Sequence, residues 1–193
     1  EKMEEILEAN TVFPLLLLEA AASAGVDAFI NTGTVLDRNL NIYSLSKDQF
    51  LQWGKFFSLH HGIQFFNIRL EQFFGPDDDD SKFVTHLIKS CINNVPELKL
   101  TKGKQKRDFI YIDDVVYAYL ALLENMSSIA DSYKEFDVGS GKPISIRAIT
   151  EMVCRMTKSK SHLIFGALPY RKGEMMFSNA EIAPLVNIGW SCE

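Results

Sequence analysis

The sequence is poor in the residues that build metal sites and disulfide scaffolds. Its 193 residues include three cysteines, Cys91, Cys154 and Cys192, which are far apart and form no C-x-x-C pair. Structural zinc sites and disulfide frameworks need such residues at close, regular spacing. We therefore expect no metal site and no disulfide, and a reducing cytoplasm is the expected compartment.

Long apolar runs and an excess of basic charge are also lacking. The longest apolar run, Val12–Leu18, is far shorter than the roughly 20 residues that a helix needs to cross a bilayer. The formal net charge is −5, whereas binding to nucleic acid requires a basic face. We therefore expect neither a membrane nor a nucleic acid as partner.

A third missing feature is the glycine-rich turn that holds a dinucleotide. No expected strand is followed by Gly-x-Gly-x-x-Gly, and Gly139-Ser140-Gly141 lacks the third glycine. The sequence also begins inside an expected helix, residues 1–10, with no capping residue before it. We expect that a segment with the missing turn precedes these residues.

Apolar periodicity predicts an alternation of strands and helices. Helix 12–24 is expected to be buried and to end at Gly25, and the runs Asp77–Asp80 and Lys102–Arg107 are expected to be turns. Such alternation is typical of an α/β protein with a mainly parallel sheet. The expected strands are 26–32, 63–70, 98–101, 109–112, 135–138 and 162–165, and the expected helices are 12–24, 43–60, 83–92, 113–125 and 145–156.

Tyr43 and Lys47 are the first candidate catalytic pair. They lie four residues apart on helix 43–60 and therefore on one face of it. A nearby ammonium favours the phenolate and lowers a tyrosine pKa from its reference value of about 10. Such a tyrosine can exchange a proton with a carbinol oxygen while hydride moves at the carbon. A tyrosine and a lysine on the surface of a helix can have the same spacing without a catalytic role. The pair alone therefore does not establish a catalytic site.

Two threonines follow the first strand. Thr32 and Thr34 lie at its carboxyl end, where open α/β sheets bind their ligands. A hydroxyl at this place can hydrogen-bond a substrate oxygen beside Tyr43. The alternative is that both threonines only cap the turn.

Several motifs in order resemble the extended short-chain dehydrogenase/reductase family, in particular its NAD-dependent epimerase/dehydratase type. They cover nearly the whole chain. The motifs are Thr32-Gly-Thr34, Tyr43-Ser-Leu-Ser-Lys47, Asn67-Ile-Arg-Leu-Glu-Gln-Phe-Phe-Gly-Pro76, Arg107-Asp-Phe-Ile-Tyr-Ile-Asp-Asp114, Phe136-Asp-Val-Gly-Ser-Gly-Lys-Pro-Ile-Ser145, Arg171-Lys-Gly-Glu174 and Ile188-Gly-Trp190.

The resemblance implies a Rossmann-like, doubly wound parallel sheet with a smaller C-terminal lobe that binds substrate. Residues 1–76 would be the remainder of the dinucleotide-binding domain. Residues 77–193 would be mostly the substrate-binding lobe, with 107–125 returning to the Rossmann domain. Members of this family typically pair two helices into a dimer interface, and the surplus of aromatic residues on helix 43–60 fits a homodimer.

The resemblance also implies roles on the catalytic side. The cofactor would be NAD or NADP. Tyr43 would be the acid/base, Lys47 would hold the nicotinamide ribose and lower the tyrosine pKa, and Thr34 would hydrogen-bond the reacting sugar oxygen. Thr32, Phe73 and Phe74 would lie at the cofactor.

On the substrate side, the resemblance implies a nucleotide sugar. Arg107 and Arg171 would grip its diphosphate, a task that suits the guanidinium fork. Glu174 would contact the nucleotide ribose, and Gln72 stands where the family usually has an asparagine that helps to hold the sugar. From the residues alone, either arginine could equally be a solvated surface charge.

One departure from the family narrows the chemistry. Dehydratases of this type carry an Asp-Glu pair after the hydroxyl residue, whereas this sequence has Val35 and Leu36 in an unusually short loop. Apolar side chains cannot exchange protons, so 4,6-dehydration is disfavoured. We expect reduction at C4 of the sugar, with 4-epimerisation as the alternative. A non-catalytic relative that binds sugar nucleotides is a further alternative.

Overall fold

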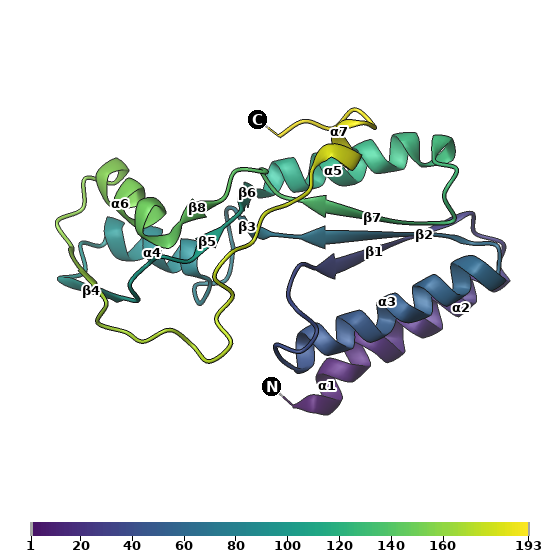
Figure 1. The fold of residues 1–193 in the computed structure, drawn as a ribbon, viewed down its shortest axis with the longest axis horizontal. Coiled ribbons are helices and arrows are strands. Elements are labelled where there is room, and N and C mark those ends of the chain that lie inside the picture. The colour runs from purple at the N-terminus through teal and green to yellow at the C-terminus, as the bar shows by residue number, and fades with distance from the viewer. Residues whose placement is uncertain (1, 193) are drawn as a thin grey trace. The chain divides into compact units, whose positions relative to one another are not determined.

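The computed structural model describes residues 2–192, which form two compact α/β units (Figure 1). The first unit contains the described residues up to Leu70 together with Ala118–Val138 and Glu181–Ser191. The second contains Glu71–Tyr117 and Gly139–Ala180. The predicted division into a dinucleotide-binding domain and a substrate-binding lobe stays a prediction; by their contacts, the compact units divide the chain after Leu70 and before Ala118.

The first unit is built on a parallel sheet in the order β1 (Ala28–Thr34), β2 (Gln64–Leu70) and β7 (Tyr133–Val138). Ala28 lies opposite Gln64, and Phe65 lies opposite Tyr133. Because all three strands run in the same direction, their carboxyl ends meet at one edge of the sheet, where ligands bind in such folds. The predicted α/β fold with a parallel sheet is confirmed.

Helix α3 (Ile42–His60) covers one face of this sheet. Phe50 of α3 packs edge to face on Phe65 of β2, with their ring centroids 5.9 Å apart. The approach is close, because a Cβ added to Gly54 would lie 2.2 Å from the Phe65 ring. Leu18, Phe57 and Ile63 complete this apolar core. The contact determines how near the inner face of α3 comes to the strands.

The opposite face of the sheet is apolar as well. Phe66 and Ile68 of β2 and Phe136 of β7 are fully buried there. Figure 1 shows α5 (Ile112–Asn125) running beside this side of the sheet. Its residues Ala118 and Leu122 are also fully buried. Both faces of β2 therefore carry buried apolar side chains, as expected for a strand between two helical layers.

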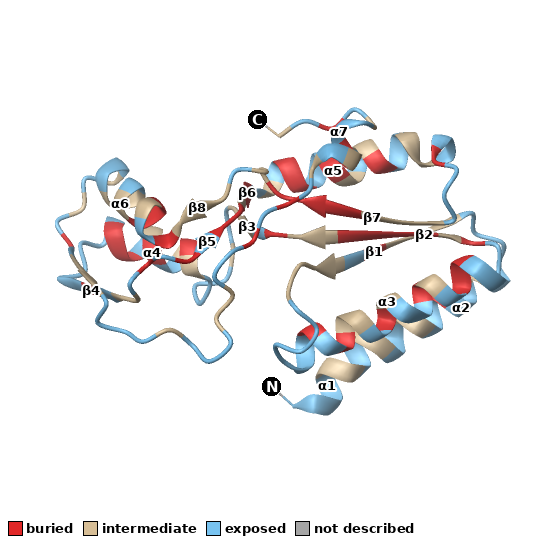
Figure 2. Ribbon diagram, in the orientation of Figure 1, coloured by how far each residue is buried: buried red, intermediate tan, exposed pale blue. Residues whose placement is uncertain are grey.

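The N-terminal helix was predicted to be buried, and this prediction is wrong. It runs continuously through α1 (Met3–Leu7), a π-helical stretch η1 (Glu8–Val12) and α2 (Phe13–Ser23). In α2 only Leu18 is fully buried, whereas Phe13 is 61% exposed and Leu16 57% (Figure 2). The helix is apolar around most of its circumference, but in this structure only one stripe packs against α3.

The same helix corrects the expectation about membrane-spanning length. Met3–Ser23 is 21 residues long and, by length and composition, apolar enough to cross a membrane. The apolar run Val12–Leu18 is only part of this helix, which continues on both sides through further apolar residues such as Ile6 and Ala20 and a few glutamates. Length and composition do not distinguish a membrane helix from an apolar surface that another protein layer covers.

The second unit consists of short strand pairs and two helices. Strand β3 (Gln72–Phe74) pairs with β6 (Phe109–Tyr111), and β4 (Glu97–Leu100) pairs with β9 (His162–Phe165), both in parallel. Strands β5 (Lys106–Arg107) and β8 (Ile144–Ser145) form an antiparallel pair. Leu87 and Cys91 of α4 (Phe83–Ile92) form a core with Leu98, against which Val153 of α6 (Ile146–Met156) packs.

The short elements are those that the sequence did not predict: β3, β5, β8, the 3₁₀ turn η2 (Met126–Ser128) and α7 (Ala183–Val186). The run Lys102–Arg107, expected to be a turn, ends in β5. The aspartate run is a turn, and its charges pair locally: Asp78 with Lys82 at 2.7 Å and Asp80 with Lys89.

Candidate active site

The first turns of α3 carry the candidate catalytic pair, and a capping box fixes where the helix begins. Ser44 N donates to Asn41 Oδ1 at 2.8 Å, and Asn41 N donates to Ser44 Oγ at 3.2 Å. The cap fixes the start of the helix, and Tyr43 and Lys47 follow it one turn apart. Lys47 Nζ donates to the main-chain oxygen of Thr32 at 3.1 Å, so the helix is tied to the carboxyl end of β1.

The pKa of Tyr43 moves in the direction opposite to the prediction. Burial raises the pKa of the Tyr43 phenol. Burial also lowers the pKa of Lys47, whose ammonium is directed to the Thr32 carbonyl. Both shifts have the same cause, because a low-dielectric surrounding disfavours the charged form of each group. The Tyr43 phenol is therefore protonated at neutral pH, which is the state of a proton donor.

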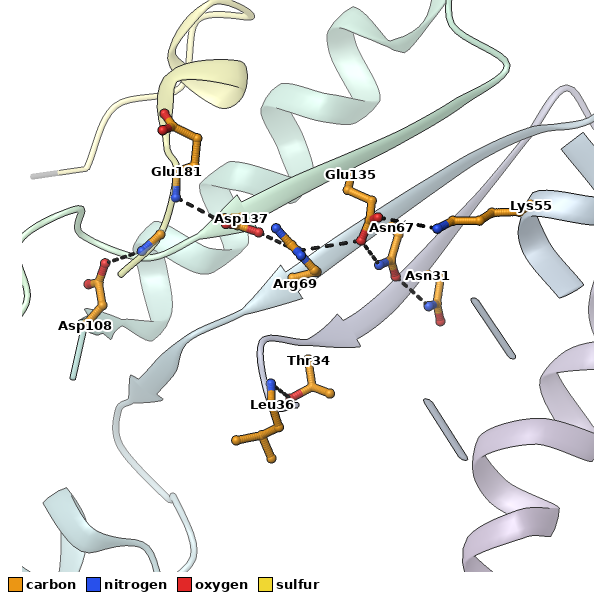
Figure 3. Close-up of polar contacts among 11 residues, drawn as sticks. Asn31, Thr34, Leu36, Lys55, Asn67, Arg69, Asp108, Glu135, Asp137 and Glu181 are labelled. Atoms are coloured by element: carbon orange, nitrogen blue, oxygen red, sulfur yellow. Dashed lines mark hydrogen bonds and ion pairs between the residues drawn. The ribbon is translucent and has the colours of Figure 1, made fainter. Parts of the chain in front are cut away.

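The two threonines point to different partners. Thr32 Oγ1 lies 2.6 Å from the hydroxyl of Tyr119 on α5. Thr34 Oγ1 accepts a hydrogen bond from Leu36 N at 3.3 Å (Figure 3). Thr34 therefore caps the turn after β1, which is the alternative role that the sequence left open for it. Sequence reasoning missed Tyr119, because nothing in the pattern of helix 113–125 marks one tyrosine as a partner of β1.

A polar cavity of about 360 Å³ lies in the first unit beside these residues. Thr34 and Lys47 line its wall, and Asn67, Arg69 and Glu135 line it from the sheet. A cavity of this size with so many polar groups has room for several hydrogen-bonded waters.

The polar groups on the sheet are paired with one another across the three strands (Figure 3). Asn31 Nδ2 donates to Asn67 Oδ1 at 2.8 Å, and Asn67 Nδ2 donates to Glu135 Oε2 at 3.0 Å. Arg69 Nε donates to Asp137 Oδ1 at 2.6 Å. Gly33 leaves room for this arrangement, because a Cβ there would lie 2.6 Å from Asn67 Oδ1. Sequence reasoning gave none of these residues a role, although polar residues at every second position of an apolar strand are a usable signal.

In the second unit, the structure joins Arg107 to Glu174. Arg107 Nη2 donates to Glu174 Oε1 at 2.7 Å, and Nη1 donates to the Lys106 carbonyl at 3.0 Å. Arg107 is buried, so it is not the solvated turn charge of the alternative reading. Burial lowers the pKa of its guanidinium, against the opposing effect of Glu174 and Glu71.

Arg171 lies in the same turn as Glu174. Glu174 N donates to the Arg171 carbonyl at 3.0 Å, and the Arg171 side chain is exposed. The structure thus brings Glu174 to Arg107 and leaves Arg171 at the surface of the turn that presents Glu174.

The remaining predicted residues lie on β3. Gln72 is exposed and pairs with Phe109, and its N–H donates to the Asp108 carbonyl at 3.2 Å. The ring of Phe73 lies 4.2 Å from Lys82 Nζ, and the ring of Phe74 packs against Tyr111 with centroids 5.7 Å apart.

Asp108 is a buried carboxylate that sequence reasoning did not single out. It is fully buried and accepts bonds from Ser140 N at 2.7 Å, Ser140 Oγ at 2.6 Å, Gly141 N at 2.9 Å and Ala180 N at 3.0 Å. A Cβ on Gly139 would lie 2.7 Å from Asp108 Oδ2, so the glycine turn is shaped around this carboxylate. Asp108 therefore joins the strand segment after Arg107 to two distant loops of the second unit.

The fold and these side chains define an α/β protein with a Tyr-x-x-x-Lys helix beside the carboxyl end of a parallel strand. Residues 1–139 match the NAD dependent epimerase/dehydratase family. The chain belongs to that family.

Among curated proteins, the chain is 37% identical to the CDP-abequose synthase of Salmonella typhimurium over 96% of its own length and 64% of the relative's. It is 33% identical to the CDP-abequose synthase of Salmonella muenchen, over 99% and 67%. The chain thus spans about two thirds of the length of the curated relatives it matches.

Solved structures agree on the fold. A UDP-glucose 4-epimerase of Thermotoga maritima with UDP-glucose matches with a TM-score of 0.85 at 20% identity, over 100% of this chain and 67% of that one. The UDP-glucose 4-epimerase of Thermus thermophilus in complex with NAD matches with a TM-score of 0.79 at 19% identity, over 95% and 65%. The predicted Rossmann-like fold is confirmed.

We predict that Asp108→Asn destabilises the protein. Asn cannot accept the same four hydrogen bonds and would bring an amide N–H against the main-chain donors, so we expect a loss of about 2 kcal/mol or more in the free energy of unfolding. Chemical denaturation monitored by circular dichroism measures it. Asp80→Asn, an exposed aspartate, is the control and should change little; equal effects of the two substitutions would contradict the role given to Asp108.

Proposed function

We propose that this chain belongs to an NAD(P)-dependent enzyme that transfers hydride at C4 of a nucleotide-linked sugar, with reduction of a 4-keto sugar as its reaction. The observation that carries the proposal is the bond from Lys47 Nζ to the Thr32 carbonyl at 3.1 Å, which places the helix of Tyr43 against the strand end of Thr34. The similarity to proteins named CDP-abequose synthase supports a nucleotide-sugar substrate.

The donors in the first unit fit the nicotinamide end of the cofactor. Lys47 gives one of the three N–H bonds of its ammonium to Thr32, so two can serve a ribose diol. Tyr43, 39% exposed, can present its hydroxyl at the same place. We assign Thr32, Phe73 and Phe74 to the surroundings of the nicotinamide, and the first unit to dinucleotide binding. Bound NAD(P)H would supply the hydride.

The second unit is proposed to bind the substrate. Arg107 and Arg171 would contact the diphosphate, for which the guanidinium fork has the matching geometry. Gln72 on β3 would contact the sugar, and Glu174 lies in the same turn as Arg171. The buried, strand-held position of Arg107 supports its role, because a fixed donor loses little entropy on binding.

Tyr43 would act as the proton donor. As hydride adds to the C4 carbonyl carbon, its oxygen gains negative charge and takes the proton of the Tyr43 phenol, while Thr34 Oγ1 hydrogen-bonds the same oxygen. The raised pKa of Tyr43 keeps the phenol protonated through neutral pH, so the rate of reduction should fall only at alkaline pH, where the phenol ionises.

The alternative at the same site is 4-epimerisation. It is supported by the fold likeness to solved UDP-sugar 4-epimerases. An epimerase must begin by removing a proton from a sugar hydroxyl, which requires the phenolate.

We predict that Tyr43→Phe in the whole protein lowers kcat by about 10²–10⁴-fold, the usual contribution of a positioned acid or base. Its stability should change little, because the hydroxyl is not part of the apolar core. Steady-state kinetics and a thermal melt measure the two quantities. Tyr117→Phe, another exposed tyrosine, is the matched control; a Tyr43→Phe variant with normal turnover would remove Tyr43 from the mechanism.

The reaction class is tested with a 4-keto-6-deoxy nucleotide sugar and reduced nicotinamide cofactor. A reductase should oxidise one equivalent of cofactor for each sugar reduced, which the absorbance of the reduced nicotinamide follows. Interconversion of 4-hydroxy sugar nucleotides without net cofactor consumption would instead establish an epimerase. Binding of the sugar nucleotide with neither reaction would favour the non-catalytic relative.

We also propose that the whole protein is a homodimer through the exposed apolar side chains of α2 and α3. They include Leu16, Leu17, Trp53, Phe56 and Leu59, which are 44–72% exposed. Large apolar side chains exposed in such number on neighbouring helices are typical of contact surfaces.

The double substitution Leu16→Glu and Phe56→Glu should therefore convert a dimer to a monomer in sedimentation equilibrium. Met156→Glu, on α6 and 77% exposed, is the control and should leave the dimer intact. A wild-type monomer that co-sediments with lipid vesicles would contradict the proposal and assign Met3–Ser23 to a membrane.

A further inference from the structure

Arg107 is a buried cation whose charge is compensated inside the second unit. Its side chain is 10% exposed, and the paired carboxylate of Glu174 is 19% exposed. A guanidinium removed from water needs such a partner, because an unpaired buried charge costs several kcal/mol. Glu71, itself buried, adds a second negative charge to the surroundings of Arg107. Arg107 therefore faces a local excess of carboxylate.

The backbone of Arg107 is held by strand pairing, whereas the backbone of Glu174 is held by a turn. Lys106 and Arg107 of β5 pair with Ser145 and Ile144 of β8. The backbone of Lys106 also bonds to Met176 and Ser178 at 2.9 and 3.1 Å, which fixes the segment that follows Glu174 and not the turn that carries it. Glu174 instead lies in the irregular segment between β9 and α7, after Gly173 at φ 74°. Its main-chain N–H is held by a single turn bond to Arg171. Moving the glutamate disrupts less structure than moving the arginine.

We infer that Glu174 occupies the anion position of Arg107 and that a substrate diphosphate must displace it. This rests on the proposed function, in which Arg107 binds the diphosphate. A carboxylate and a phosphate offer the same acceptor oxygens to a guanidinium, at the same range of distances. Glu174 thus lowers the affinity for every diphosphate and prevents weaker anions from occupying Arg107.

When the diphosphate replaces the Glu174 carboxylate at Arg107, no group of the protein has to gain or lose a proton. The diphosphate oxygen takes the Nη2–H that Glu174 now accepts, and the turn Arg171–Glu174 carries the released carboxylate away. The movement would also reposition Arg171, because Glu174 and Arg171 share the turn hydrogen bond. Glu174 is then a positioning residue for both arginines, and its contribution to affinity is unfavourable.

The test is the binding of CDP and of inorganic pyrophosphate, measured by calorimetry at low ionic strength. For Glu174→Gln we expect both ligands to bind about tenfold more tightly than to the unchanged protein, which corresponds to ~1.4 kcal/mol. Glu151→Gln is the matched control, because Glu151 pairs with Arg147 at 3.5 Å on the exposed face of α6 in the same unit. It removes the same charge and should leave both affinities unchanged.

Three outcomes separate the explanations. Weaker CDP binding with unchanged pyrophosphate binding in Glu174→Gln would overturn the inference and assign Glu174 to the nucleotide ribose. Weaker binding of both ligands would make Glu174 a structural support of the site. Arg107→Ala should abolish binding of both; if it does not, the proposed role of Arg107 itself is wrong. Glu174→Ala is a second neutral variant, and a melt of each variant establishes that it folds.

Discussion

The close packing of Phe65 on α3 at Gly54 is the contact on which the arrangement of the first unit depends. With no side chain at residue 54, the helix lies near enough to β2 for Phe50 and Phe65 to share one core. Eleven residues separate Gly54 from Tyr43, so the height of the helix on the sheet also determines where Tyr43 and Lys47 stand at the strand ends. At this separation Lys47 Nζ reaches the Thr32 carbonyl at 3.1 Å.

The second constraint is that a buried charged group needs a partner, and both units contain such pairs. Buried Asp137 is paired with Arg69, buried Arg107 with Glu174, and buried Asp108 with main-chain donors and one hydroxyl. Such groups are costly when alone and acceptable when fully bonded. Arg107 is already paired with Glu174 in the chain by itself, so in our proposal a diphosphate that binds there would exchange with the glutamate.

The long elements could be predicted because their sequence pattern is repeated over many residues. Helices α3, α4 and α6 and strands β2 and β9 lie within a residue or two of their expected bounds. Strands of two residues such as β5 and β8 are too short to show a repeated pattern, so only their partners define them. The N-terminal helix was placed correctly but expected to be buried, since periodicity says which side is apolar and not what covers it.

The same division holds for the site. The sequence by itself determined the family through its ordered motifs, and with it the parallel α/β fold and the candidate residues Thr34, Tyr43, Lys47 and Arg107. Only the tertiary structure decided the partner of Arg107, the raised pKa of Tyr43 and the polar ladder from Asn31 to Asp137. Partners and pKa values depend on distance and burial, which residues far apart in the chain create together when they fold.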